Sequence, residues 1–209
     1  MGERERIREA AFELVLERGW REVTEESVAE RAGLDPAVFE RSYADVEECL
    51  LAVYNEAAAE MMARVADAVA AEESWLEQMR ALGQAIFEFL LEDERRARFF
   101  VVEVVSGGDR VRLARERDLK EICAQIDRGR FELDDPDSVG PDTAQAVAGA
   151  VFLRVSRKVM AGDFQGQGAV EIVPELMHSL VLPYLGEEAA IAELHRPPPP
   201  PPPVPTRRG

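Results

Sequence analysis

The segment VTEESVAERAGLDPAVFERSY, residues 23–43, has the pattern of two short helices joined by a turn. Thr24 predicts an N-cap for a helix that starts at Glu25, since a threonine oxygen can accept an orphan amide hydrogen there. Ala32-Gly33 predicts the turn. Asp35 predicts the cap of the next helix, with Pro36 at the first helical position, where proline is favoured. The segment therefore predicts a helix-turn-helix.

Helical patterns continue on both sides of this segment. A helix over residues 3–18 is predicted from one apolar face, formed by Ile7, Ala10, Ala11, Leu14 and Val15. Asp45 with Glu48 predicts a capping box for a long helix to about residue 71. Further helices are predicted near residues 74–91, 94–105, 109–128, 142–161 and 169–185, and no strand-like alternation is present. We therefore expect an all-α chain.

Composition limits the compartment and the partners. The chain has 209 residues, of which 46% are hydrophobic, and a net charge of −16. Residues 1–50 contain seven Arg, no Lys and fourteen Asp plus Glu, a net charge of −7, which opposes attraction to phosphate. No apolar run is long enough to span a bilayer and the first residues are charged, so no membrane partner and a cytoplasmic location are expected. Cys49 and Cys123 match no metal or redox spacing and are predicted to be buried free thiols.

Residues 4–53 together resemble the tetracycline-repressor (TetR) family of transcriptional regulators. The resemblance depends on Ile7, Ala10, Ala11, Leu14, Glu17-Arg18-Gly19, Thr24, Val28-Ala29, Ala32-Gly33, Phe39, Tyr43, Glu47 and Leu50-Leu51-Ala52-Val53. It implies a helix-turn-helix DNA-binding domain over residues 1–45 and a helical ligand-binding and dimerisation domain over residues 46–195. It also implies a homodimer joined by the last two long helices and a small-molecule pocket. Residues 196–209, with seven consecutive prolines, are expected to form a disordered, extended tail.

The chain departs from the family on the surface that would face DNA. Asp35, Pro36, Ala37 and Val38 replace the usual Ser, Lys or Arg, Gly and Thr, and Glu40 replaces a tyrosine. Ser42 replaces a histidine and Val46 a lysine, while the resemblance implies that Arg41 and Thr24 are phosphate contacts. An altered readout is one interpretation, in which Glu40 or Asp35 accepts from a cytosine amino group and Val38 or Ala37 touches a thymine methyl. The predicted DNA-binding residues are Thr24, Asp35, Pro36, Ala37, Val38, Glu40, Arg41, Ser42, Tyr43 and Val46.

Three functions stay open at this point. The first is a ligand-responsive regulator, expected to be a repressor, that binds DNA as a homodimer. The second is a related protein whose acidic recognition helix has lost or altered DNA binding and that acts as a ligand sensor or interaction protein. The third, an enzyme, is disfavoured because two histidines so placed assemble no catalytic arrangement.

Apolar side chains of the body predict a pocket for a small hydrophobic ligand, although buried packing explains the same pattern. The predicted ligand-binding residues are Met61, Met62, Trp75, Met79, Phe87, Phe99 and Phe100, with Phe89 as a further member of this set. Glu175 and His178 have the Glu-x-x-His spacing of di-iron helical bundles, but such a site needs a second copy of the motif. We therefore expect no metal site and no cofactor.

Overall fold

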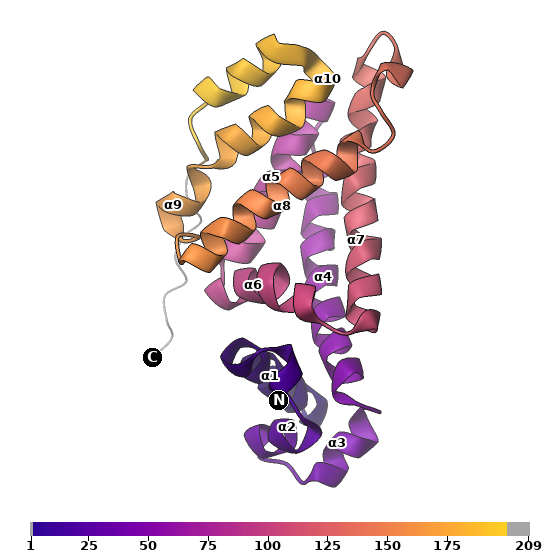
Figure 1. The fold of residues 1–209 in the computed structure, drawn as a ribbon, viewed down its shortest axis with the longest axis vertical. Coiled ribbons are helices and arrows are strands. Elements are labelled where there is room, and N and C mark those ends of the chain that lie inside the picture. The colour runs from indigo at the N-terminus through magenta and orange to yellow at the C-terminus, as the bar shows by residue number, and fades with distance from the viewer. Residues whose placement is uncertain (1, 200–209) are drawn as a thin grey trace. The chain divides into compact units, whose positions relative to one another are not determined.

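The computed structural model describes residues 2–199, and every regular element among them is helical (Figure 1). This confirms the all-α prediction. The longer helices are α1 (Glu3–Arg18), α2 (Glu25–Ala32), α3 (Pro36–Ser42), α4 (Val46–Ala70), α5 (Trp75–Leu91), α6 (Glu94–Arg98), α7 (Asp109–Asp127), α8 (Thr143–Ala161), α9 (Gly166–Val170) and α10 (Val173–His195). Most of the proline-rich tail predicted over residues 196–209 lies outside the described residues.

The helices belong to two compact units with interleaved sequence. Unit 1 comprises residues 1–60 and 98–118, and unit 2 comprises residues 61–97 and 119–209. The sequence predicts a domain boundary near residue 45. That division differs from the limits of the two compact units, and it stays a prediction. Helices α4 and α7 are continuous across the limits of the units, so each unit receives one part of both helices.

The core of unit 1 forms around α1. The predicted apolar face of this helix is buried in full, from Ile7 to Val15. Phe39 of α3 and Leu50 of α4 join it, and the segment 98–118 adds Phe99, which is fully buried. Phe99 packs on Phe12 of α1 with ring centroids 5.1 Å apart. A segment distant in sequence thus completes the core on which the helix-turn-helix is built.

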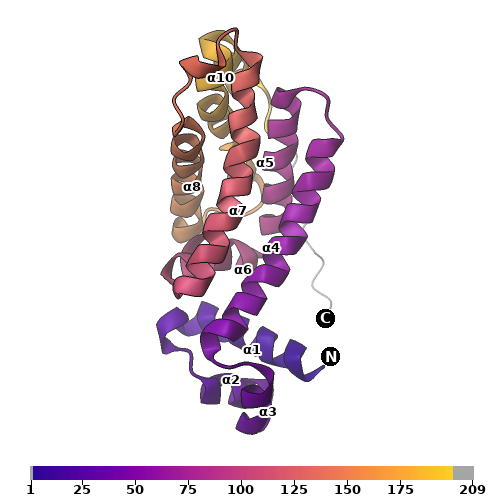
Figure 2. The same cartoon turned by 90° about the vertical axis from the view of Figure 1, so that its right-hand side faces the viewer.

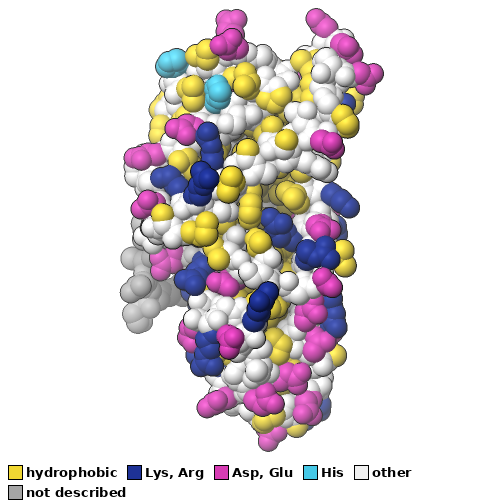
Figure 3. Space-filling view, viewed as in Figure 1, with side chains coloured by type: hydrophobic (Ala, Val, Ile, Leu, Met, Phe, Trp, Pro, Cys, Tyr) yellow, Lys and Arg dark blue, Asp and Glu magenta, His cyan; other side chains and the backbone are white. Residues whose placement is uncertain are grey.

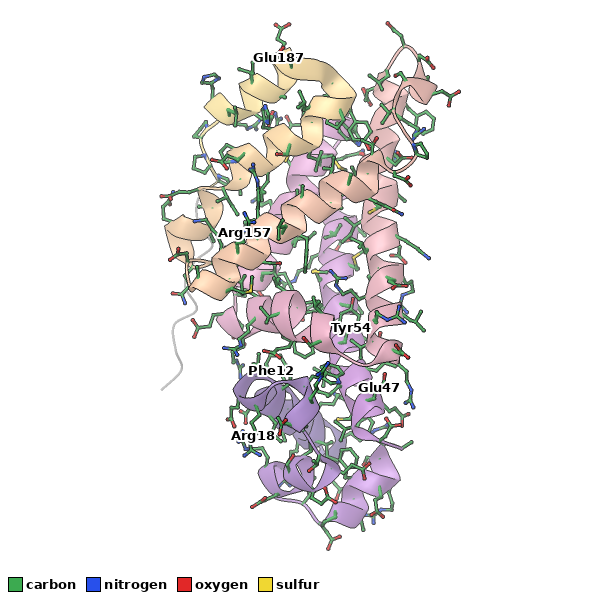
Figure 4. The ribbon with its side chains drawn as sticks, in the orientation of Figure 1. Phe12, Arg18, Glu47, Tyr54, Arg157 and Glu187 are labelled. Carbon is green, nitrogen blue, oxygen red and sulfur yellow. The ribbon has the colours of Figure 1, made fainter. Side chains whose placement is uncertain are left out.

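Polar contacts hold α4 to α7 within unit 1. The Tyr54 hydroxyl donates to the buried Asp118 carboxylate at 2.8 Å. At the start of α7 the Arg110 amide donates to the Glu47 carboxylate at 2.8 Å, and the Arg110 guanidinium donates to Asp45 at 2.8 Å. Figure 4 labels Glu47 and Tyr54 on α4. The bonds to Arg110 reach the start of α4, where the Glu48 amide donates to the Asp45 carboxylate at 2.7 Å, one half of the predicted capping box. The Glu48 carboxylate accepts from the Ala44 amide at 2.6 Å instead of the Asp45 amide, so the reciprocal half differs from the prediction.

Unit 2 is built on an aromatic pair. Trp75, at the first position of α5, packs on Tyr184 of α10 with ring centroids 5.1 Å apart. Its indole N–H donates to the Gln125 carbonyl at 3.2 Å. A Cβ at Gly129 would lie 2.4 Å from the Trp75 ring, so only glycine fits beneath it. Both aromatic side chains are buried and fix the distance between α5 and α10.

Helix α10 differs from the predicted last helix over residues 169–185. The structure has a short α9 and then α10, which continues to His195 across a bend at Gly186, where φ is +79°. Figures 1 and 2 show the arm beyond the bend in yellow. The sequence predicts that the last helix ends at residue 185, just before Gly186. In the structure the positive φ of Gly186 bends the chain, and a second helical arm follows.

The second arm of α10 is held to α5 by a buried ion pair. The Glu193 carboxylate is 3% exposed and accepts from Arg80 Nε at 3.1 Å, with a second bond from the same guanidinium. Arg80 also pairs with Glu77 on its own helix. Among residues 2–199, none of the helices is long and apolar enough to cross a membrane.

Candidate nucleic-acid interface

The turn of the helix-turn-helix is fixed by local bonds and by α1. Thr24 caps α2, because its hydroxyl accepts from the Ser27 amide at 3.2 Å. Gly33 has φ +64° and ψ 40°, the left-handed conformation that ends the helix. The Arg6 guanidinium donates to the carbonyls of Ala32 and Gly33, the latter at 3.2 Å. The predicted caps and turn are therefore present, and α1 supports the turn from behind.

Helix α3 presents one face to the core and one to solvent. Asp35 is its N-cap and accepts from the Ala37 amide at 2.9 Å, and Pro36 occupies the first turn. Val38 and Phe39 point into the core of unit 1. The exposed residues of α3 form its outer face, which consists of Pro36, Ala37, Glu40 and Arg41. This exposed helix face is the surface available for a base edge or a phosphate.

Most arginines of the first fifty residues have protein partners. Arg4 donates to the Ser42 carbonyl at 2.9 Å and lies 4.9 Å from the Tyr43 ring centre. Arg8 forms an ion pair with Glu56 at 2.9 Å, and Arg31 binds both Glu13 and Glu17. The pKa of the Glu17 carboxyl is lowered by the hydrogen bond from Arg31. Figure 3 shows acidic side chains around the part of unit 1 that includes α2 and α3.

Arg41 is different, because within residues 2–199 it has neither a hydrogen bond nor an ion pair with the protein. It is exposed, on the outer face of α3, and next to Glu40, which is equally without a partner among the described residues. The outer face therefore offers one free guanidinium and one free carboxylate. A free guanidinium can neutralise a phosphate, whereas a paired one would first have to break its internal contacts.

Two predicted DNA contacts need correction, because their side chains are buried. Val38 is 9% exposed and lies in the core of unit 1, so it does not reach a thymine methyl. Tyr43 is 3% exposed, packs on Phe39, and its hydroxyl accepts from Arg8 at 3.5 Å. Both side chains support α3 from the inside.

The other predicted DNA contacts lie at or near the surface. Thr24 is exposed, although its hydroxyl is used in the cap of α2. Ser42 is half-buried and donates to the Val38 carbonyl at 2.7 Å. Val46 is half-buried against the core of unit 1 at the start of α4. The exposed members of the predicted set are Thr24, Asp35, Pro36, Ala37, Glu40 and Arg41.

The predicted ligand-binding residues do not gather in one place. Phe99 and Phe100 belong to unit 1, where Phe100 packs on Tyr54 with ring centroids 5.5 Å apart. This corrects their assignment to a pocket of the body, since they complete the core around α1. The members in unit 2 are the buried Met61, Trp75, Met79 and Phe87, the half-buried Met62, and the buried Phe89. Phe87 packs on Phe164 with ring centroids 5.3 Å apart.

Unit 2 contains one polar group that the sequence analysis missed. The Tyr184 hydroxyl is buried and has no hydrogen-bond partner in the described structure, and burial raises the pKa of this phenol to about 12. A buried hydroxyl without a partner is destabilising by about 1–3 kcal/mol, so a bound water or ligand group is expected to satisfy it. Nothing in the sequence pattern around Tyr184 indicates that its hydroxyl is unpaired.

Glu175 and His178 do not form part of a larger ligand set. The Glu175 carboxylate pairs with Arg154 of α8 at 3.1 Å. Over residues 2–199, no group of three or more His, Cys, Asp or Glu side chains is arranged to hold a metal ion.

Neither a scan against protein-family models nor a search of curated proteins found a match for this chain. Solved structures do match. The fatty acid degradation regulator FadR from Bacillus halodurans has 17% identity and a TM-score of 0.70, with 86% of this chain and 95% of that chain covered. FadR from Bacillus subtilis, in complex with stearoyl-CoA, has 18% identity and a TM-score of 0.71, with 88% and 98% covered. A TetR-family regulatory protein from Rhodococcus RHA1 has 16% identity and a TM-score of 0.68, with 90% and 100% covered.

These likenesses show that the chain has the all-α fold of the TetR-family regulators. They confirm the resemblance proposed from residues 4–53 and extend it over most of the chain. All three matched structures are described as regulators or regulatory proteins, and that of Bacillus subtilis FadR as a transcriptional regulator.

Proposed function

We propose that this chain is a ligand-responsive transcriptional regulator that binds DNA as a homodimer and acts as a repressor. The single observation that supports this most is the outer face of α3. It is the exposed second helix of a helix-turn-helix, capped and supported from behind, with a free guanidinium at Arg41. In this motif the second helix enters the major groove and its exposed side chains contact base edges.

The dimer is proposed to form through the last two long helices, α8 and α10. Leu153 and Met160 of α8 are 51% and 65% exposed, and Leu182 of α10 is 42% exposed. Large apolar side chains in such number on two neighbouring helices favour burial against another protein surface. A second copy satisfies this need with one self-complementary patch, as two-fold dimers do.

The ligand is proposed to be a small hydrophobic molecule bound in unit 2. Met79 and Phe87 supply apolar surface, and the buried Tyr184 hydroxyl supplies one neutral hydrogen-bonding group. The Bacillus subtilis FadR chain binds stearoyl-CoA, which agrees with an apolar ligand for this fold. Helix α4 begins in unit 1 and ends in unit 2, so a ligand-induced shift of α4 would be transmitted along the helix to the DNA-binding unit.

The proposal is tested by fluorescence anisotropy of the purified chain with duplexes from around its own gene, at several salt concentrations, and with shuffled duplexes as the control. We expect one fragment to bind far more tightly than its shuffled copy, with an affinity that falls as salt rises. Equal, weak binding of all duplexes at low salt by a folded dimer would contradict the proposal. It would favour the other interpretation, in which the acidic recognition helix no longer binds DNA.

A further inference from the structure

The outer face of α3 contains a carboxylate, that of Glu40, which can accept hydrogen bonds from a base edge. Glu40 is exposed, and no hydrogen bond or ion pair engages its carboxylate among residues 2–199. Asp35, the other acid of this helix, is fixed as the N-cap by its bond from the Ala37 amide. Of the two acids proposed from the sequence to contact a base, Glu40 is therefore the one whose side chain is not held in place by a cap.

The chemistry of the major groove restricts what Glu40 can bind. An ionised carboxylate only accepts hydrogen bonds. The donors on base edges in this groove are the amino groups of cytosine and adenine, and the adenine amino group lies beside the N7 acceptor. A side-chain amide matches that donor–acceptor pair in adenine, whereas a carboxylate matches the cytosine amino group.

Neighbouring residues fit this assignment. Ala37 lies three residues before Glu40, so the two side chains share one face of α3, and the Ala37 methyl is exposed beside it. A small apolar side chain suits contact with a thymine methyl. Val38, the other apolar candidate, is buried. Arg41 follows Glu40 and supplies the cation that offsets the carboxylate close to phosphates.

We propose that Glu40 determines the DNA specificity of this chain by accepting a hydrogen bond from a cytosine amino group in each half-site, with Ala37 against a neighbouring thymine methyl. This inference rests on the proposed function. The carboxylate also acts against wrong sequences, because the phosphates of every duplex repel it and only a duplex with an amino group at the right position offsets this repulsion with a hydrogen bond. The acidic helix is therefore a selective element and lowers binding to unrelated DNA.

The test is selection of bound duplexes from a randomised pool by the full chain and by its variants. Wild type is expected to enrich a half-site with cytosine at one fixed position, preferred by about 5- to 150-fold over other bases. Glu40→Gln is expected to move the preference at that position to adenine, because a side-chain amide pairs with the adenine N6 and N7. Glu40→Ala is expected to lose the preference there and to keep it elsewhere in the half-site.

The matched control is Glu26→Gln, which removes one exposed acidic charge from α2 instead of α3. It is expected to change affinity for all duplexes alike and to leave the selected sequence unchanged. If Glu40→Gln behaves in the same way, with tighter binding but the wild-type sequence, the carboxylate only repels phosphate and the inference is overturned. If wild type and all variants, shown to be folded by circular dichroism, enrich no sequence, the proposed function itself fails.

Discussion

Arg80→Met is expected to destabilise the protein strongly, because it leaves the Glu193 carboxylate buried without a counter-ion. Glu193 is 3% exposed, and Arg80 supplies both of its side-chain hydrogen bonds. Methionine retains the apolar stem of arginine, so the change removes mainly the charge and the donors. The pair joins α5 to the second arm of α10, beyond the bend at Gly186.

The size of the effect follows from this burial. Removal of one partner from a buried ion pair costs about 3–5 kcal/mol. A change of 1 kcal/mol shifts the melting temperature of a chain of this size by about 2–4 °C, so Tm is expected to fall by about 6–20 °C. Urea unfolding followed by far-ultraviolet circular dichroism, at fixed protein concentration, measures the loss of free energy of unfolding.

Two further variants separate burial from charge. Arg80→Met with Glu193→Leu removes both charges and should recover most of the lost stability, since replacement of both partners by apolar groups is often neutral. Arg112→Met is the matched control, because Arg112 pairs with Asp109 and Glu116 on an exposed surface of α7, where water and salt screen the charges and only a small loss of stability is expected. A single variant Arg80→Met within 1 kcal/mol of wild type, or a double variant no more stable than the single one, would refute this reasoning.

Four other outcomes are expected. Gly33→Ala should lower the free energy of unfolding, measured in urea, by about 1–2 kcal/mol, because φ is +64° at this position. Gly83→Ala, at a helical position with open space, should raise it by up to about 1 kcal/mol. Equal effects of the two changes would contradict this expectation. Burial raises the pKa of the Cys49 thiol to about 12, so a thiol reagent at pH 8 should label Cys49 only after the protein unfolds. Rapid labelling of Cys49 in the native protein would contradict its burial. The hydrogen bond from Arg64 lowers the pKa of Glu92 below its ordinary value of 4.5, so the contribution of Glu92 to stability is present above pH 4.5 and is lost as pH falls through the folded pKa. The difference in free energy of unfolding between wild type and Glu92→Gln should therefore narrow as pH falls below 4.5, and a difference that grows there would contradict the lowered pKa. Arg41→Ala should weaken binding to all duplexes and reduce the salt slope by about one charge for each α3 in contact, while an unchanged slope would exclude a phosphate contact.

The local features of the fold were predictable because short-range chemistry determines them. Thr24 and Asp35 cap α2 and α3 as their residue types suggest, and Gly33 ends α2 in the left-handed conformation. The buried face of α1 follows from a helical repeat over sixteen residues. These features depend on neighbours within four positions, which the sequence displays directly.

Features that depend on long-range packing were not predictable. Helix α3 has seven residues, too few for its repeat to show that Val38 faces the core. Phe99 and Phe100 have the pattern of any apolar helix, and only the return of residues 98–118 to unit 1 places them beside α1. Whether the Tyr184 hydroxyl has a hydrogen-bond partner likewise depends on every group around it, and these groups come from distant parts of the sequence.

The central claim is that the outer face of α3 binds DNA, and hydrogen exchange with and without a selected duplex tests it most directly. At saturating duplex, slower exchange is predicted in peptides that cover residues 24–46, with no protection of the exposed surface of α7. Exchange in residues 24–46 that is unchanged while the duplex is bound, or protection found only on other helices, would contradict the account.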